Sequence, residues 1–578
     1  MLQSDKTRFH RLVRDLSAVM LEYQLGADAV IGSALKKWCS NSFPKLPQSS
    51  LPFVYTLENE DSVCAFVNFV KEQELLESTY WFSSAYAQLL EKDYRKRLAM
   101  FFTPPALTRR LLDDLSANGV DFSDSSFCDP ACGGGAFLAP IAMRMKEELF
   151  RKGANSYEII DHINNKLLGF DKDITLCELS RHFLLMALYE EIVSTGIHPN
   201  FQIYHGDSLL KGMDFMGKFD VVVCNPPFRK MSKIEYNKYI ENFSDVIEAQ
   251  PNLYSLFFAL CINILKKKGI CALITPTSFL SGQYFSKLRR FLLSQTRILC
   301  IGIVNDRLGV FIDVSQETTL TLACRENSGC TPSNKTKVSV VSRDGNYVDV
   351  GACVLPACGA AWPIPRTESD VTLLKNASKS SVSLADYGYA ARVGAFVWNR
   401  DTRTTYASAE SASKEYSDAI VPLLWSSDIT QDGRLLFTGA LKTNNEHCFV
   451  NMGKKDHPSI VKNFCVILQR VTSNSQSRRL IAAAVPKELF ETYSGFVGEN
   501  HTVILEQIVI EPELAPSQFA ELLRTPIVDR YFRCISGATN VSIFELNQLR
   551  LPEPAKLKYY LSQGNNMADS ARKALEEM

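Results

Sequence analysis

The chain begins with a stretch whose apolar positions recur every three or four residues. This spacing runs from Phe9 to Tyr23 and returns from Val63 to Val70. Such a period gives an α-helix one apolar stripe that can pack against other helices. We therefore expect residues 1–95 to form a helical N-terminal region, and no residue in it suggests chemistry.

The pattern changes at about residue 96 to short apolar runs that alternate with helical periods. The clearest runs are residues 167–171, 219–228, 269–276 and 298–304. β-rich runs between amphipathic helices are typical of βαβ units and of a mostly parallel sheet. We expect an α/β domain over residues 96–365. Residues 366–578 mix strands and helices without a clear period and are expected to form a separate, mixed α/β domain.

Composition and charge exclude several classes of protein. The chain has 578 residues, of which 46% are hydrophobic and 22% charged, an ordinary globular mixture. Basic and acidic residues balance at 63 each, so any surface for an anionic polymer must be local. No apolar run approaches the roughly 20 residues that span a bilayer, and the start of the chain lacks a signal-peptide core. We expect a soluble, cytoplasmic protein without membrane partners.

Sixteen cysteines are scattered along the chain without a metal-binding pattern. There is no CxxC pair, and the closest group, at residues 324–358, has no histidines at ligand spacing. Zinc sites need closely spaced ligand pairs. We expect no metal, and mostly buried free thiols in a reducing compartment.

A glycine-rich segment ends the first apolar run of the α/β domain. Residues 129–138 have the sequence DPACGGGAFL, in which Asp129 ends a predicted strand and the three glycines lead into a helix. Consecutive glycines let the backbone approach a ligand closely, beside the free N–H groups of a helix start. The segment matches neither GxGxxG nor a phosphate loop. A simple turn remains the alternative.

Two acidic residues follow the next two predicted strands. Asp171 ends the run at 167–171, and Asp207 follows a short strand at 201–204. A carboxylate at the tip of the second strand suits a ribose diol, because it can accept both hydroxyl protons. The carboxylate of Asp207 is placed to accept a hydrogen bond from an adenine amine. Each of the two can instead be a surface acid in a loop.

The fourth predicted strand breaks into Asn225, Pro226, Pro227 and Phe228. The prolines lack N–H groups and fix φ near −65°, so this loop is stiff. The amide oxygen of Asn225 and the neighbouring carbonyl can then converge on one amino group. Phe228 offers a flat apolar face to a planar base. This combination of residue types is the strongest chemical signal in the chain.

Together these segments resemble the S-adenosylmethionine-dependent N6-adenine DNA methyltransferases, in the motif order of the gamma class that includes the TaqI-type enzymes. The similar residues span about 97–325. They include an upstream motif at 102–105, in which Thr103 is expected to be the N-cap of a helix with Pro104 at its first position. Gly134 and Phe228 depart from the commoner Ser and Tyr of the family.

The resemblance implies a Rossmann-like class I methyltransferase fold and a base flipped into the pocket. It implies that Asn225, Pro226, Pro227 and Phe228 form the catalytic motif and that Phe228 and Phe311 stack on the base. It also implies S-adenosylmethionine as the cofactor, held by the residues that line its site: Thr103, Asp129, Ala131, Gly133, Asp171, Asp207 and Phe257.

The C-terminal residues 366–578 resemble the target-recognition regions of such enzymes more weakly. The similar segments are 468–473, 478–480, 499–501 and 536–552. Between residues 442 and 488 there are eight Lys or Arg against three acids, a local basic excess that favours contact with phosphates. A solvated charged face is the alternative. The candidate contacts to double-stranded DNA are Lys454, Lys455, Arg470, Arg478 and Arg479.

The sequence therefore predicts a site-specific adenine DNA methyltransferase, the modification enzyme of a restriction-modification system, acting at the bacterial nucleoid. A separate cognate restriction endonuclease is a possible partner. Two alternatives stay open: an N-methyltransferase that acts on RNA or on protein glutamine, and the modification subunit of a multisubunit restriction system. No nuclease pattern is found in residues 1–95, so a fused endonuclease is not expected.

Overall fold

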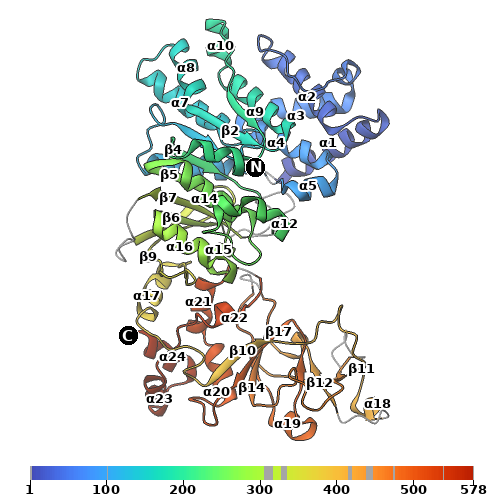
Figure 1. Ribbon diagram of the computed structural model, residues 1–578, viewed down its shortest axis with the longest axis vertical. Helices are drawn as coiled ribbons and strands as arrows, with labels where there is room; N and C mark the ends of the chain where they lie inside the picture. The colour runs from blue at the N-terminus through green and yellow to red at the C-terminus, as the bar shows by residue number, and fades with distance from the viewer. Residues whose placement is uncertain are drawn as a thin grey trace. The chain divides into compact units, whose positions relative to one another are not determined.

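The computed structural model describes residues 3–100, 102–304, 317–326, 335–413, 419–437, 447–472, 476–537 and 539–576. The chain divides into two compact units (Figure 1). Unit 1 comprises Met1–Thr277, Tyr284–Asp349 and Ala357–Gly359. Unit 2 comprises Ser278–Gln283, Val350–Pro356 and Ala360–Met578. The finer division at residues 95 and 365 stays a prediction.

Residues 3–98 are mainly helical, as the period of their apolar residues predicts, with a longer non-helical stretch at 43–54. Their apolar stripes meet in one core with residues of helix α9, including Leu176 and Phe183. Trp81 lies fully buried in this core, with its ring 4.6 Å from that of Phe9. The N-terminal helices are therefore packed onto the α/β part of unit 1 (Figure 1). They are α1 (Gln3–Glu22), α2 (Ala27–Ser42), α3 (Asp61–Lys71), α4 (Leu75–Leu89) and α5 (Lys92–Leu98).

A nine-stranded sheet forms the centre of unit 1, in the order β3-β2-β1-β4-β5-β7-β6-β8-β9. The strands from β3 to β5 are parallel, whereas β7 runs antiparallel to both β5 and β6. The strands are β1 (Phe127–Asp129), β2 (Leu167–Asp171), β3 (Gln202–His205), β4 (Phe219–Cys224), β5 (Leu265–Pro276), β6 (Thr296–Val304), β7 (Thr318–Arg325), β8 (Lys335–Val341) and β9 (Tyr347–Val354).

The order of the parallel strands creates a switch point between β1 and β4. From β1 the chain adds β2 and β3 on one side, and then returns to place β4 and β5 on the other. Ligands of open α/β sheets bind at such a point, beyond the carboxyl ends of the strands. The predicted Rossmann-like α/β sheet is confirmed, and the four apolar runs of the sequence contribute β2, β4 and parts of β5 and β6.

Helices cover both faces of this sheet, and local sequence explains where several of them begin. Helix α8 starts with a capping box between Asn155 and Glu158, and Asp173 caps α9 by accepting from the N–H of Leu176. The longer helices of this part are α6 (Pro105–Ala117), α7 (Leu138–Arg151), α8 (Ser156–Lys166), α9 (Ile174–Ala187), α10 (Tyr189–Thr195), α14 (Leu253–Ile264) and α16 (Ser286–Gln295).

Unit 2 contains two four-stranded sheets, in the orders β10-β17-β14-β15 and β11-β13-β12-β16. The first packs on the helices in a core that includes Tyr389 and Phe519, whose rings stack at 4.3 Å. The expected mixed α/β composition is confirmed. The strands are β10 (Tyr389–Val393), β11 (Thr405–Tyr406), β12 (Ile420–Leu424), β13 (Phe449–Asn451), β14 (Cys465–Gln469), β15 (Ala482–Ala484), β16 (Val497–Gly498) and β17 (Thr502–Gln507). The helices are α17 (Glu368–Ala377), α18 (Ala409–Ser413), α19 (Lys487–Tyr493), α20 (Pro516–Leu523), α21 (Pro526–Ile535), α22 (Ile543–Leu546), α23 (Pro554–Ser562) and α24 (Met567–Glu576).

Two further predictions concern the cysteines and membrane-spanning helices. Most of the described cysteines are buried, and all of them are free thiols, as predicted. None of the described helices combines the length and the apolar character needed to cross a membrane.

Candidate active site

Four residues singled out in the sequence follow neighbouring parallel strands. Asp129 ends β1, Asp171 ends β2, Asp207 lies two residues beyond β3, and Asn225 directly follows β4. Because these strands are parallel and adjacent, their carboxyl ends meet at one edge of the sheet. The chain thus brings all four to the edge of the sheet at which the switch point between β1 and β4 lies.

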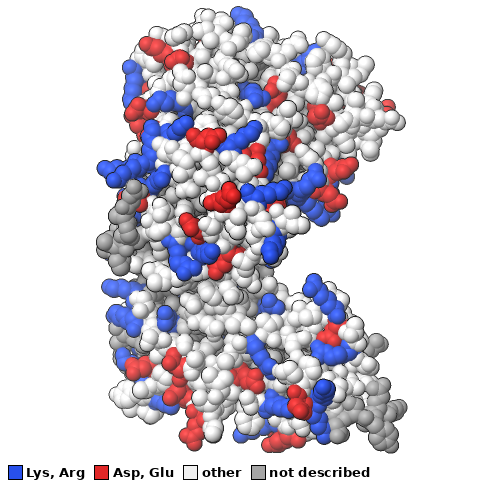
Figure 2. All heavy atoms as spheres, in the orientation of Figure 1, with Lys and Arg blue, Asp and Glu red and all other residues white. Residues whose placement is uncertain are grey.

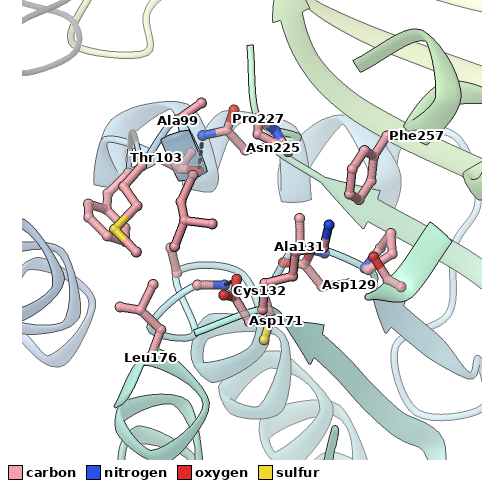
Figure 3. A pocket seen from close by; sticks show the side chains of 18 of the residues that line it. Ala99, Thr103, Asp129, Ala131, Cys132, Asp171, Leu176, Asn225, Pro227 and Phe257 are labelled. Carbon is pink, nitrogen blue, oxygen red and sulfur yellow. Dashed lines mark hydrogen bonds between the residues drawn. The ribbon is translucent and has the colours of Figure 1, made fainter. Parts of the chain in front are cut away.

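A cavity of about 870 Å³, partly open to solvent, lies at this edge. Figure 3 shows Thr103 and Asn225 on one side of the cavity and Asp171 and Leu176 on the opposite side. The predicted site residues that line it are Thr103, Asp129, Ala131, Gly133, Asp171, Asn225, Pro227 and Phe257.

The carboxylate of Asp171 is held by two backbone N–H groups. Gly133 donates to Oδ2 at 2.9 Å and Asp173 donates to Oδ1 at 2.8 Å. Gly133 has a φ of +53°, which a residue without a Cβ adopts at low cost. Burial raises the pKa of Asp171 to about 6, although the two backbone donors favour its ionised form. The carboxylate therefore faces the cavity in a fixed orientation.

Asp129 lies deeper in the same edge and is 1% exposed. Its Oδ1 accepts a 3.0 Å hydrogen bond from the backbone N–H of Ala131. Burial raises the pKa of Asp129 to about 8, the N–H of Ala131 lowers it, and the charge of Asp171 raises it further. Burial therefore raises the pKa of both carboxyl groups of the cavity.

Gly134, where the family more commonly has Ser, packs against the N-terminal helices. A Cβ atom at this position would lie 2.0 Å from the Oγ of Ser83, which is buried on α4. The hydroxyl of Ser83 thus occupies the space that a side chain at residue 134 would need. The glycine loop and α4 fit each other only because residue 134 is glycine.

Asn225 contacts the upstream motif. Its Nδ2 donates a 3.0 Å hydrogen bond to the Oγ1 of Thr103, which is 3% exposed (Figure 3). Thr103 is not the helix N-cap that the sequence suggests, and that expectation is wrong by one residue. Helix α6 begins at Pro105, and Pro104 is its N-cap with an extended backbone. A residue that precedes a proline is driven into this conformation, which frees the side chain of Thr103 to meet Asn225.

The other members of the predicted catalytic motif differ in their position relative to the cavity. Pro226 is buried, and Pro227 lines the cavity. Phe228 is half-buried, outside the lining of the cavity, with its ring perpendicular to that of Tyr254 at 6.2 Å. Phe311, the second predicted base-stacking residue, lies outside the described residues.

Asp207 differs from the other predicted cofactor residues because it does not line the cavity. Its Oδ2 accepts hydrogen bonds from Tyr239 at 2.6 Å and from Lys172 at 2.8 Å, and its Oδ1 caps α11 (Ser208–Lys211). The next residue, Ser208, does line the cavity. The role of Asp207 at an adenine amine stays a prediction.

One wall of the cavity consists of residues that the sequence did not predict as part of the site. Arg97, Leu98, Ala99 and Met100 line it, and they come from the end of α5 and the residue pair that follows. Ala99 ends the helix in the left-handed region, with a φ of +50°. The basic sequence KDYRKRL at 92–98 was an available signal, but nothing in its spacing ties it to the glycine loop.

The basic candidates of the tail fall into two groups. Lys454 and Lys455 are exposed, and Arg470 and Arg478 are half-buried. Arg479 is fully buried: its Nε donates to Thr472, and its guanidinium lies over the ring of Phe532. It cannot reach a phosphate, so its assignment as a DNA contact is wrong. Basic and acidic side chains are interspersed on the face that Figure 2 shows.

The four segments of the tail that resemble recognition regions come together in unit 2. The N–H of Arg470 donates to the carbonyl of His501 at 2.8 Å, and the N–H of Thr472 donates to that of Thr539 at 2.9 Å. The hydroxyl of Thr472 donates to the carbonyl of Arg479 at 3.0 Å. Segments far apart in the sequence thus form one hydrogen-bonded cluster.

Comparisons with known proteins point to one class of enzyme. Residues 134–311 match the family model described as Eco57I restriction-modification methylase. The chain is 24% identical over 473 residues to Type II methyltransferase M.BsuBI of Bacillus subtilis, covering 79% of this chain and 88% of that protein. It is 25% identical over 358 residues to Type II methyltransferase M.PstI of Providencia stuartii, covering 61% and 68%.

A solved structure extends the likeness of the fold to the whole chain. The Type IIL restriction-modification enzyme MmeI, in complex with DNA, aligns with a TM-score of 0.55 and 12% identity. The alignment covers 100% of this chain and 95% of that chain. At this identity the likeness concerns the fold alone.

Proposed function

We propose that this chain, whose residues 134–311 form a restriction-modification methylase domain of the Eco57I type, methylates N6 of a specific adenine in duplex DNA. S-adenosylmethionine is the methyl donor, and the base is flipped into the cavity. The domain match and the similarity to Type II methyltransferases support DNA as the substrate. We assign target recognition to residues 366–578.

One observation carries the proposal. The Asn-Pro-Pro-Phe loop after β4 and the carboxylate of Asp171 after β2 open into the same cavity. The first can hold an amine and the second a ribose diol. Because the two strands flank β1, an amine at Asn225 and a nucleoside at Asp171 are bound side by side.

The residues of the cavity fit the proposed cofactor by their chemistry. Asp171 offers carboxylate oxygens to a diol, and the apolar ring of Phe257 offers a face to a planar base. In the first turn of α6, which Thr103 precedes, Pro105 has no N–H and the N–H of Leu107 donates to the carbonyl of Pro104, so we assign the N–H of Ala106 to donate to a carboxylate. When bound, the cofactor supplies an electrophilic methyl group on a sulfonium centre.

The chain's own contribution to the reaction is chiefly positioning. The hydrogen bond from Nδ2 to Thr103 orients the amide of Asn225, and we assign its Oδ1 to accept from the target amine. The carbonyl of Pro226 accepts the second hydrogen of that amine. Two such bonds localise the lone pair of the nitrogen toward the methyl group and turn it into a nucleophile. Phe228 holds the flipped base by stacking.

The experiment is methyl transfer by the purified chain. Tritiated S-adenosylmethionine is supplied with duplex DNA, RNA or a protein lysate, and the methylated base in DNA is identified by sequencing. We expect label in duplex DNA and N6-methyladenine at one recurrent sequence. Label only in RNA or in protein glutamine would replace the proposed substrate. Activity only after a second protein is added would identify a modification subunit of a multisubunit system.

A further inference from the structure

Asp173, which had no role in the sequence analysis, is a buried carboxylate held by the N-terminal helices. It is 3% exposed. The hydroxyl of Tyr86 donates to its Oδ2 at 3.0 Å, and the hydroxyl of Tyr94 donates to the same oxygen at 3.1 Å. Oδ1 accepts from the N–H of Leu176 at 3.0 Å and so caps α9. Both tyrosines belong to the region to which the sequence assigned no function.

Asp173 is connected in turn to the carboxylate that faces the cavity. Its backbone N–H donates to Oδ1 of Asp171 at 2.8 Å, opposite the bond from Gly133 to Oδ2. A shift of Asp173 therefore moves one of the two donors that orient Asp171. Lys172, between the two acids, lines the cavity and pairs with Asp207 at 2.8 Å. The loop 171–173 is thus one hydrogen-bonded unit.

The hydrogen bond from Tyr94 to Asp173 also fixes the wall of the cavity formed by Arg97–Met100. Tyr94 lies on α5, and none of the side chains of α5 is buried, so apolar packing contributes little to its position. The residues that line the cavity, Arg97–Met100, follow Tyr94 within six positions. Its hydrogen bond to Asp173 therefore anchors this wall to the loop that carries Asp171.

The two hydroxyls remain donors under ordinary conditions. Burial raises the pKa of Tyr86, and the charge of Asp173 raises it further; burial and the same carboxylate raise the pKa of Tyr94. Neither tyrosine ionises near neutral pH. A buried carboxylate that loses such donors is poorly compensated and either moves or takes up a proton.

We infer that Tyr86 and Tyr94 are positioning residues of the cofactor site, which act through Asp173 on Asp171 and on the wall 97–100. The N-terminal helical region then helps to position residues of the S-adenosylmethionine pocket. This inference rests on the proposed function, because it takes Asp171 to hold the cofactor.

The experiment measures the dissociation constant of S-adenosylmethionine for the full chain by calorimetry. The variants are Tyr86→Phe, Tyr94→Phe and the pair together, each of which removes only hydroxyl groups. We expect each single variant to bind the cofactor several-fold more weakly, and the pair to bind it about 10-fold or more weakly, which is less per bond than a direct hydrogen bond to a charged group because the hydroxyls act through Asp173. Affinity for duplex DNA without cofactor should not change.

Tyr80→Phe is the matched control. Tyr80 is equally buried on α4, but in the described structure no hydrogen bond joins it to Asp173. It should leave the affinity for the cofactor unchanged, while any general loosening of α4 would appear in its thermal melting. Tyr94 is half-buried on a short helix. The variant Tyr94→Phe therefore still tests the inference if Tyr86→Phe folds poorly.

A double-mutant cycle distinguishes positioning from general packing. If the tyrosines act through Asp173, their substitution in an Asp173→Ala background, which has no acceptor for their hydroxyls, should cost much less cofactor affinity than in the natural chain. Equal costs in both backgrounds, or an unchanged affinity in the double Phe variant, would overturn the inference. A natural chain that binds no S-adenosylmethionine would instead overturn the proposed function.

Discussion

Asn225 and Thr103 lie 122 residues apart in the chain, yet Nδ2 of Asn225 donates a 3.0 Å hydrogen bond to Oγ1 of Thr103. The bond joins the end of β4 to the residues just before α6. It therefore couples the loop proposed to hold the target amine to the helix start proposed to hold the cofactor carboxylate.

Replacing Asn225 by Ala should abolish most of the transfer. The variant loses the amide oxygen proposed to accept from the target amine, and removal of one such preorganised group slows chemistry by about 100-fold or more. Single-turnover rates with bound DNA measure the chemical step, and calorimetry should show nearly unchanged cofactor affinity. Asn165→Ala, at an exposed position of α8, is the control. Turnover near that of the natural chain would refute the assignment of Asn225.

Replacing Thr103 by Val should slow transfer without unfolding the chain. Val keeps the shape but removes the acceptor for Nδ2 of Asn225. Loss of one neutral hydrogen bond costs about 1 kcal/mol, or roughly five- to tenfold in the rate if the bond orients Asn225 during the reaction. Thr103→Ser keeps the hydroxyl and should retain the rate. A Val variant as fast as the natural chain would show that this hydrogen bond does not orient Asn225 in the reaction.

Replacing Asp171 by Ala should weaken the binding of S-adenosylmethionine. Hydrogen bonds to an ionised carboxylate are each worth about 1.5–3 kcal/mol, so we expect a loss of at least about tenfold in affinity. Duplex binding without cofactor should stay the same. Asp161→Ala, at an exposed position of α8, provides the comparison. An equal loss of both affinities would mean that Asp171 serves the fold instead.

Cofactor affinity should depend on pH through Asp171, whose pKa burial raises to about 6. The ionised carboxylate is the better acceptor, so affinity is full above this pKa and is lost as the pH falls through it. Titration calorimetry between pH 5 and 8, a range of roughly one unit or more on either side, follows this step. Asp171→Asn should abolish the step. Asp129→Asn should keep it, because burial raises the pKa of Asp129 to a separate value of about 8.

The basic residues of the tail should separate into DNA contacts and structural residues. Lys454→Ala and Lys455→Ala, at exposed positions, should each lower the salt dependence of DNA binding by about one if they contact phosphates. Arg479→Ala should leave that slope unchanged and lower the free energy of unfolding by about 1–3 kcal/mol, because it removes a buried, bonded guanidinium. DNA binding measured across a salt series tests the slopes, and chemical denaturation tests the free energy of unfolding. An unchanged slope in both lysine variants would show that the DNA-binding face does not include Lys454 and Lys455.

The part of the site that depends on local sequence was predictable. Asp129, Asp171 and Asn225 each end or follow a strand, and parallel strands that alternate with helices must bring their carboxyl ends together. The motif resemblance then supplied their roles, and the family match over residues 134–311 confirms the likeness to restriction-modification methylases. Their individual roles stay predictions.

The part that depends on distant contacts was not predictable. Nothing in the spacing of Tyr86 or Tyr94 points to Asp173, since the partners lie 87 and 79 residues apart. Arg479 looks like its exposed basic neighbours in the sequence, and only the packing of unit 2 shows that it is buried. The helix start at Pro105 shows a smaller failure, because the restriction that a proline puts on the preceding residue outweighed the capping preference of Thr.

The close approach of Gly134 and Ser83 has a consequence for recombination between related enzymes. A chimaera that takes the glycine loop from a parent with Ser at this position and the N-terminal helices from this chain would place a Cβ atom 2.0 Å from the Ser83 hydroxyl. Ser83 lies fully within the packed helices and has little room to give way. The two segments therefore have to be inherited from the same parent, and a crossover point for domain exchange belongs before α4 or after Gly134, never between them.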